Sequence, residues 1–173
     1  MTVAYVGVGS NVDPEFNVLE ALRRLAARVR VTGVSTFYRT APLGAPGSPA
    51  FVNGVWRAET ELGPRELKLG ALRVVEDELG RRRSGDRNAP RTIDLDLLVH
   101  GDEVVREPGL EVPDPELLVR PFAAWPLWEL APELVVPGSG RRLADAVQEL
   151  ARGGMEPLPE LTRRLRVEVE HES

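Results

Sequence analysis

The sequence predicts one α+β domain in which an antiparallel sheet is covered by helices. Its 173 residues, of which 42% are hydrophobic and 28% charged, are typical of a single globular domain with a sizeable core. Segments whose apolar residues alternate with period two are separated by segments whose apolar residues recur at helical spacing. These segments follow one another in the order β-α-β-β-α-β, and the chain contains no internal repeat.

The first half of the chain opens with a strand rich in β-branched residues, which ends at the turn-forming residues Gly9-Ser10-Asn11. Asp13 is a good N-cap residue and Pro14 a good first helical residue, so a helix follows. The predicted elements are a strand at 2–8, a helix from 14 to about 28, a strand at 31–38, a Pro/Gly-rich loop at 41–49 and a strand at 51–59.

The second half contains one long helix, whose end is marked by Gly80, followed by an arginine-rich loop. Further along, frequent prolines break the chain into short elements. The predicted elements are a helix at 64–79, the loop 81–91, strands at 92–100 and 104–105, short helices at 115–120, 122–130 and 143–151, and an edge strand or helix at 163–170. The order of the elements is that of a ferredoxin-like core with an antiparallel sheet.

The composition excludes several classes of function. The chain has no cysteine, so it has no disulfide framework, thiolate metal site or cysteine nucleophile. The net charge of −5 argues against broad nucleic-acid binding. No apolar segment approaches the length needed to span a bilayer, and the N-terminus has no basic leader, so we expect a cytoplasmic monomer without membrane or nucleic-acid partners. Lys68 is the only lysine.

The most informative segment is the strand that contains Asp94 and Asp96. Side chains alternate along a strand, so the two carboxylates share one face while the intervening leucine faces the core. Their Cα atoms are expected about 6.6 Å apart, because each residue of a strand rises about 3.3 Å. Carboxylates so placed repel each other, and a hard cation such as Mg²⁺ relieves that repulsion. On this pattern alone, a solvated strand face is an equally good interpretation.

Arginines directly precede this pair of carboxylates in the sequence. Phosphoryl transfer needs such a mixture, because the protein contributes mainly positioning and charge neutralisation through Mg²⁺ and guanidinium groups. A nucleotide substrate is therefore predicted, although a solvated loop with surface ion pairs is the alternative for the arginines alone. The arginines concerned are Arg81, Arg82, Arg83, Arg87 and Arg91.

Other motifs narrow the chemistry further. Gly7-Val8-Gly9 lacks the third glycine of a dinucleotide site, and the chain has no P-loop sequence and no histidine set for zinc or a catalytic triad. Asn53 stands in mid-strand near Phe51, where its amide can hydrogen-bond a flat heterocycle on which the ring stacks. Phe122 could supply a second stacking face. A strand asparagine bonded to backbone and a core phenylalanine are the alternatives.

Residues 87–98, Arg-Asn-Ala-Pro-Arg-Thr-Ile-Asp-Leu-Asp-Leu-Leu, resemble the signature of the 6-hydroxymethyl-7,8-dihydropterin pyrophosphokinase family. The resemblance extends in order to residues 4–11, 35–43, 51–53 and 125–132. It implies Mg-dependent transfer of diphosphate from ATP to the hydroxymethyldihydropterin in folate biosynthesis, with AMP as the leaving group. With this resemblance, we expect a three-layer α/β/α sandwich built on the ferredoxin-like core. Residues 1–152 form the expected domain, and residues 153–173 an extension packed on it.

The resemblance also implies roles for individual residues. Asp94 and Asp96 would coordinate two Mg²⁺ ions and, with Arg81 and Arg91, form the catalytic set. The implied pterin-binding residues are Thr40, Ala41, Leu43, Phe51, Asn53 and Phe122. The implied ATP-binding residues are Glu76, Arg81, Arg83, Arg91 and Arg120.

Two positions depart from the pattern of the family. Asp114 stands where many relatives have a histidine that helps to bind a phosphate, and Asn88 stands where some have a tryptophan. An acidic side chain repels phosphate unless it points away or meets a cation, so ATP affinity is the property most affected. We also expect the loops 41–49 and 81–89 to close over the substrates. Two alternatives remain: a non-catalytic ferredoxin-like domain that binds a small molecule, and a two-metal nuclease.

Overall fold

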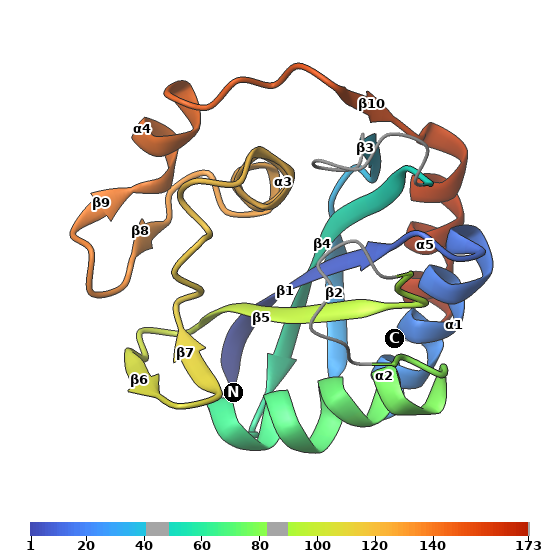
Figure 1. Cartoon of the computed structure of the whole chain (residues 1–173). Helices are drawn as coiled ribbons and strands as arrows, with labels where there is room; N and C mark the ends of the chain where they lie inside the picture. The colour runs from blue at the N-terminus through green and yellow to red at the C-terminus, as the bar shows by residue number, and fades with distance from the viewer. Residues whose placement is uncertain (41–48, 83–89, 173) are drawn as a thin grey trace.

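A computed structural model describes residues 1–40, 49–82 and 90–172. Its centre is an antiparallel sheet in the order β10-β3-β4-β1-β5, with β2 also paired to β4 (Figure 1). The strands of this sheet are β1 (Thr2–Ser10), β2 (Arg30–Val34), β3 (Tyr38–Thr40), β4 (Phe51–Thr60), β5 (Asp94–His100) and β10 (Met155–Pro157). Two small hairpins lie beside it: β6 (Val105–Glu107) with β7 (Leu110–Val112), and β8 (Val135–Val136) with β9 (Arg141–Arg142).

Helices cover both faces of the sheet, so the predicted three-layer sandwich is confirmed (Figure 1). The first face packs against α1 (Pro14–Ala26), η1 (Glu66–Leu72), α2 (Arg73–Glu78) and α5 (Pro159–Glu172). The second face packs against α3 (Pro121–Leu130) and α4 (Leu143–Gln148). Each layer has its own apolar core, with Trp56 and Leu22 in the first and Leu98 and Leu127 in the second.

The alternation of β5 separates its two functions. Leu95 and Leu97 belong to the core under α1 and α2, as the sequence predicted. The opposite face carries Asp94 and Asp96, followed by Leu98 in the second core. On this face, the apolar packing of the second layer therefore ends at Leu98, and the two carboxylates lie beyond it toward the start of β5.

Several predicted elements differ from the structure. The strand predicted at 31–38 is two strands, because residues 35–37 leave the ladder between them. Phe37 turns inward there and packs on Gly54, at which a Cβ atom would lie 2.4 Å from the ring. Residues 115–119 form turns instead of the helix predicted at 115–120. The pre-proline residue Arg120 has an extended backbone, with φ −106° and ψ 111°, which ends any helix before Pro121.

Two helices also differ in detail from the expectation. Asp13 lies before α1 with a positive φ of 41° and its side chain makes no capping hydrogen bond. The helix predicted at 64–79 begins as a π-helix, η1, and continues as α2. Its end at Gly80, with φ of 78°, is as predicted.

The C-terminal segment, for which the sequence left strand and helix open, contains both. Met155 of β10 pairs with Thr40 of β3, and α5 places Leu161 and Leu165 in the first core. Arg152 connects the tail to the second layer, since its guanidinium lies 4.9 Å from the ring centroid of Trp125. The tail therefore supports the strand that carries Thr40. In the described part of the chain, no helix is both long and apolar enough to cross a membrane.

Candidate active site

The register of three neighbouring strands aligns Asn53, Gly9 and Asp94 in one row across the sheet. Gly9 of β1 pairs with Asn53 of β4 on one side and with Asp94 of β5 on the other. Two residues earlier in β1, Gly7 pairs with Asp96. We call the set Asn53, Gly9 and Asp94 the glycine row. It brings together two residues that lie 41 positions apart in the sequence.

Gly9 keeps the middle of this row open. A Cβ atom at this position would lie 2.9 Å from Oδ1 of Asn53 and 4.0 Å from Cβ of Asp94. Any side chain would therefore collide with the amide and fill the space between the two polar groups. The sequence analysis considered this glycine only as part of an incomplete dinucleotide motif, because the cross-strand partners cannot be seen in the sequence.

Asn53 is held in a fixed orientation. Its Nδ2 donates to Oγ1 of Thr40 over 2.7 Å, and both side chains are buried. That bond leaves Oδ1 facing Gly9. Phe51 begins the same strand and pairs with Thr40 on β3. The structure thus brings together three of the residues predicted to bind the pterin, and Ala41 and Leu43 lie outside the described residues.

Arg91 is clamped to the end of β1 by the residue that follows the strand. The backbone N–H of Arg91 donates to Oδ1 of Asn11 over 2.7 Å, and the backbone N–H of Asn11 donates to the carbonyl of Arg91 over 3.0 Å. Ser10 donates to the carbonyl of Thr92 over 2.6 Å. The guanidinium of Arg91 in turn donates to Oδ2 of Asp94 over 2.9 Å. Ser10 and Asn11 therefore position the arginine that the sequence predicted, although the sequence showed them only as a turn.

Glu76 lies on the free edge of β5. Its buried carboxylate accepts a hydrogen bond of 2.9 Å from the backbone N–H of Leu95, the residue between the two aspartates. The family resemblance implied a place near the ribose. In the structure, one of its oxygens accepts an edge-strand N–H that would otherwise lack a partner, and its place near the ribose stays a prediction.

Asp96 lies in a strongly anionic environment. Burial, the neighbouring Asp94 and Asp114, and then Glu76 raise the pKa of Asp96 to about 8, against the opposing effect of Arg120. Burial also raises the pKa of Asp114, while Arg120 and Lys68 lower it. These effects favour the protonated form of Asp96, and a bound cation would favour its ionised form.

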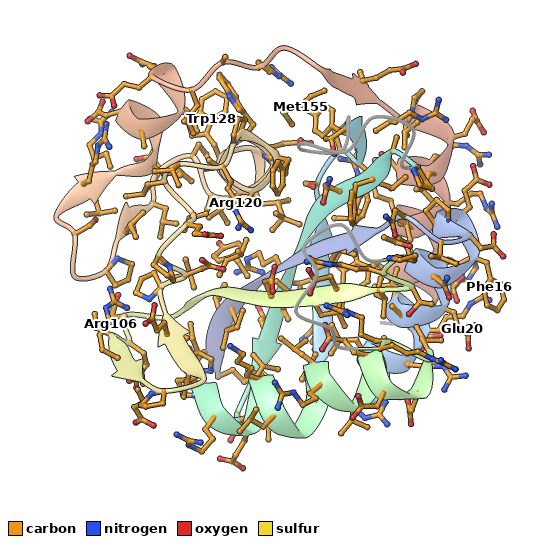
Figure 2. All side chains as sticks on the ribbon, viewed as in Figure 1. Phe16, Glu20, Arg106, Arg120, Trp128 and Met155 are labelled. Atoms are coloured by element: carbon orange, nitrogen blue, oxygen red, sulfur yellow. The ribbon has the colours of Figure 1, made fainter. Side chains whose placement is uncertain are left out.

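Two further predicted arginines, Arg81 and Arg120, lie within the described residues. The backbone N–H of Arg81 donates to the carbonyl of Glu76 over 2.9 Å, and its Nε is buried without a partner among the described residues. Arg120 lies beside α3 (Figure 2), paired with Glu116 and 5.8 Å from the ring centroid of Phe122. The predicted ATP-binding residue Arg83 and the departure at Asn88 lie outside the described residues.

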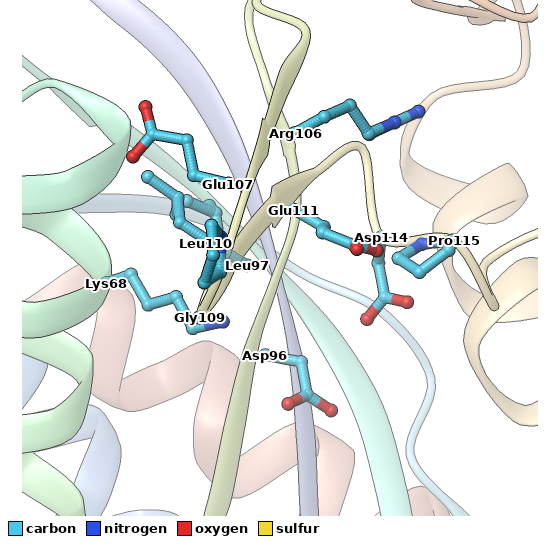
Figure 3. Close-up of a pocket in the computed structure, with 11 residues that line it drawn as sticks. Lys68, Asp96, Leu97, Arg106, Glu107, Gly109, Leu110, Glu111, Asp114 and Pro115 are labelled. Carbon is cyan, nitrogen blue, oxygen red and sulfur yellow. The ribbon is translucent and has the colours of Figure 1, made fainter.

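A pocket of about 560 Å³ adjoins the carboxylates on the side of the β6–β7 hairpin (Figure 3). Its lining combines apolar and charged groups, among them Lys68, Asp96, Leu97, Arg106, Leu110 and Asp114. We call it the acidic pocket. The mixture of leucines, carboxylates and two cations suits a ligand with an apolar ring and a charged chain.

Sequence comparison identifies close relatives. A profile of the 7,8-dihydro-6-hydroxymethylpterin-pyrophosphokinase (HPPK) family matches residues 5–132. The chain is 40% identical over 159 residues to the 2-amino-4-hydroxy-6-hydroxymethyldihydropteridine pyrophosphokinase of Pseudomonas aeruginosa. This match covers 90% of this chain and 96% of that protein. It is 37% identical over 145 residues to the Haemophilus influenzae protein of the same name, with coverages of 80% and 88%.

Structural comparison agrees with this result at the level of the fold. A crystal structure of Plasmodium falciparum HPPK-DHPS superimposes with a TM-score of 0.63 at 10% sequence identity. The match covers 86% of this chain but only 43% of that chain, so this chain spans less than half of it. The predicted ferredoxin-like α+β fold is therefore confirmed. Together with the sequence relatives, the comparisons show that the chain belongs to the 7,8-dihydro-6-hydroxymethylpterin-pyrophosphokinase family of folate-synthesis enzymes.

Proposed function

We propose that this enzyme transfers the diphosphoryl group of ATP to the hydroxymethyl group of 6-hydroxymethyl-7,8-dihydropterin in a Mg²⁺-dependent reaction that releases AMP. The glycine row carries the proposal. It places an amide that can recognise a heterocycle next to a carboxylate, with Gly9 as an open floor between them. A pterin bound over Gly9 would form hydrogen bonds with the amide of Asn53, and its hydroxymethyl group would point toward Asp94.

The reaction makes one bond and breaks one. The hydroxymethyl oxygen attacks the β-phosphorus of ATP, and the bond from that phosphorus to the bridging α,β-oxygen breaks, so that AMP leaves with the electron pair. The hydroxyl proton is lost as the new bond forms, and Asp94 would accept it. Arg91, held by Asn11 and bonded to Asp94, would keep the phosphate chain in line with the attacking oxygen.

The residues present fit a magnesium site. Asp94 and Asp96 share one strand face, and their mutual repulsion contributes to the raised pKa of Asp96, which is a strain that a divalent cation would relieve. Mg²⁺ in such enzymes is bound by one or two carboxylates together with water and substrate phosphates. When bound, it would neutralise charge on the phosphate oxygens. The backbone N–H of Arg81 donates to the carbonyl of Glu76, and the charge of Arg120 acts on Asp96. Both arginines would add positive charge for the phosphates.

The test is to incubate the protein with Mg²⁺, ATP and 6-hydroxymethyl-7,8-dihydropterin and to separate AMP from ADP over time. We expect AMP to form only when the pterin is present, and Asp94→Ala to abolish it. Asp102→Ala is the matched control, because Asp102 is an exposed turn residue just beyond the end of β5 and is not part of the row. ADP as product would refute the proposed transfer.

Two other results would favour the alternatives named above. Pterin binding without turnover, unaffected by Asp96→Ala, would indicate a non-catalytic binding domain. Metal-dependent release of nucleotides from DNA would indicate a nuclease.

A further inference from the structure

We propose that Lys68 is a nucleotide-binding residue whose ammonium group donates to the phosphate chain of ATP from the wall of the acidic pocket opposite Asp114. This inference rests on the proposed ATP-dependent reaction and identifies a residue for which neither the motifs nor the family resemblance gave a role.

The backbone at Lys68 is unusual. Lys68 lies within the π-helix η1, and the backbone N–H of Arg73 donates to the Lys68 carbonyl five residues earlier, in place of the ordinary four-residue spacing. A π-turn contains one more residue than an α-turn and therefore changes the direction of the side chains in it, and such turns occur frequently at functional sites. Leu67, the preceding residue, stays fully buried in the core. The π-turn thus keeps the helix packed while Lys68 lines the pocket.

The second cation of the pocket is already used. One guanidinium nitrogen of Arg106 donates to the backbone carbonyls of Val105, Val112 and Pro113 at 3.2 to 3.3 Å. Figure 3 shows Arg106 pointing away from Asp96, whereas Lys68 extends from its helix across the pocket toward strand β5. Within residues 1–40, 49–82 and 90–172, Lys68 makes no hydrogen bond or ion pair. It is thus the lining cation that can bind a ligand without breaking a hydrogen bond or an ion pair within these residues.

The negative charge of the pocket would oppose phosphate binding unless a cation offsets it. Asp96 and Asp114 both line it, and one oxygen of Asp114 accepts the backbone N–H of Glu116 over 2.9 Å, which holds the carboxylate at the pocket wall. A phosphate chain entering beside Asp114 would meet repulsion. Lys68 faces the same space and already has a favourable interaction with Asp114. A lysine acts as a compact point charge on phosphate oxygens and needs no fixed geometry to do so.

The test measures binding of three ligands to the full-length protein by calorimetry: a non-hydrolysable Mg-ATP analogue, AMP and adenosine. We expect Lys68→Met to weaken binding of the ATP analogue about tenfold or more while adenosine binding stays unchanged. Lys68→Arg should keep most of the affinity. Arg73→Met is the matched control, because it removes one positive charge from an exposed position on the same helix, five residues further on. It should leave all three affinities unchanged.

Several results would overturn the inference. Unchanged affinity for the ATP analogue in Lys68→Met would do so, and so would an equal loss for adenosine, which would place the contact on the nucleoside. If Lys68→Met does not fold, Lys68→Gln, which keeps a polar end, gives the same comparison. Because binding is measured without turnover, the result is separate from the AMP assay. A parent protein that makes no AMP would refute the proposed reaction, and the affinities would still decide the role of Lys68.

Discussion

The glycine row and the acidic pocket lie on two sides of the same pair of aspartates but depend on different kinds of structure. In the row, Asn53, Gly9 and Asp94 are aligned by backbone pairing, so their spacing cannot change without a shift of strand register. In the pocket, Lys68 and Asp114 belong to a helix and a turn, and their effect depends on charge. Pterin recognition should therefore tolerate little change, whereas nucleotide binding should be adjustable by single substitutions.

The largest effect is expected from Gly9→Val. Its side chain would occupy the floor of the row and collide with Oδ1 of Asn53, which a Cβ atom alone would approach to 2.9 Å. We expect KM or Kd for the pterin to rise about a hundredfold or more, with ATP binding nearly unchanged. Fluorescence titration with the pterin measures this. Gly70→Ala is the control, since nothing lies within 4 Å of a Cβ atom there. Normal pterin affinity in Gly9→Val would show that the pterin does not bind on the row.

The next effect is expected from Asn11→Ala, which removes the acceptor for the backbone N–H of Arg91. Leaving a partly buried donor unpaired costs about 1–3 kcal/mol, and if half of this is expressed in the transition state, kcat falls about two- to tenfold. Asn11→Asp retains an acceptor and should recover most of kcat. Steady-state kinetics of the three proteins decide the point, and equal kcat in Asn11→Ala and the parent would contradict a positioning role for this residue.

The metal-free protein should lose stability as the pH rises. The fold raises the pKa of Asp96 to about 8, from 3.8 for an aspartate without these interactions. The folded state therefore holds the proton more tightly than the unfolded state. By linkage, the free energy of unfolding falls between about pH 4 and pH 8, by the order of 1–3 kcal/mol for this partly exposed group. Asp96→Asn should flatten this slope in thermal unfolding with a chelator present. An identical slope in both proteins would show that Asp96 does not cause it.

The smallest effect is expected from Asp114→Asn. The amide can still accept the backbone N–H of Glu116, so the turn is kept while the negative charge is removed. We expect ATP to bind about threefold more tightly, with pterin affinity unchanged. The same calorimetric measurement shows whether the change is confined to the nucleotide. A loss of pterin affinity would mean that the two regions are coupled.

The sequence predicted most of the fold and the chemistry of β5, because both depend on local pattern. Asp94 and Asp96 alternate with leucines, and the strand and its two faces follow from that pattern alone. The break at Phe37 was missed because it depends on Gly54, which lies on a different strand. The turns at 115–119 were missed because the backbone restriction imposed by Pro121 outweighs helical propensity over so short a segment.

The parts of the site that depend on contacts between distant segments could not be predicted. Asn11 and Arg91 are 80 positions apart, and only the antiparallel pairing of β1 with β5 brings them together. Glu76 was assigned to the nucleotide from the resemblance, whereas its bond to Leu95 depends on how α2 packs against the free edge of β5. Lys68 was noted only as the single lysine, because a π-turn gives no clear signal in the sequence.

The most direct test of the proposed reaction is to follow it by phosphorus NMR. The parent protein is mixed with Mg²⁺, ATP and 6-hydroxymethyl-7,8-dihydropterin, and the signals of the products are assigned. We predict AMP and a pterin ester with two coupled phosphorus resonances, which shows that both phosphoryl groups moved together. A pterin ester with one phosphorus resonance, formed together with ADP, would contradict the transfer of a diphosphoryl group.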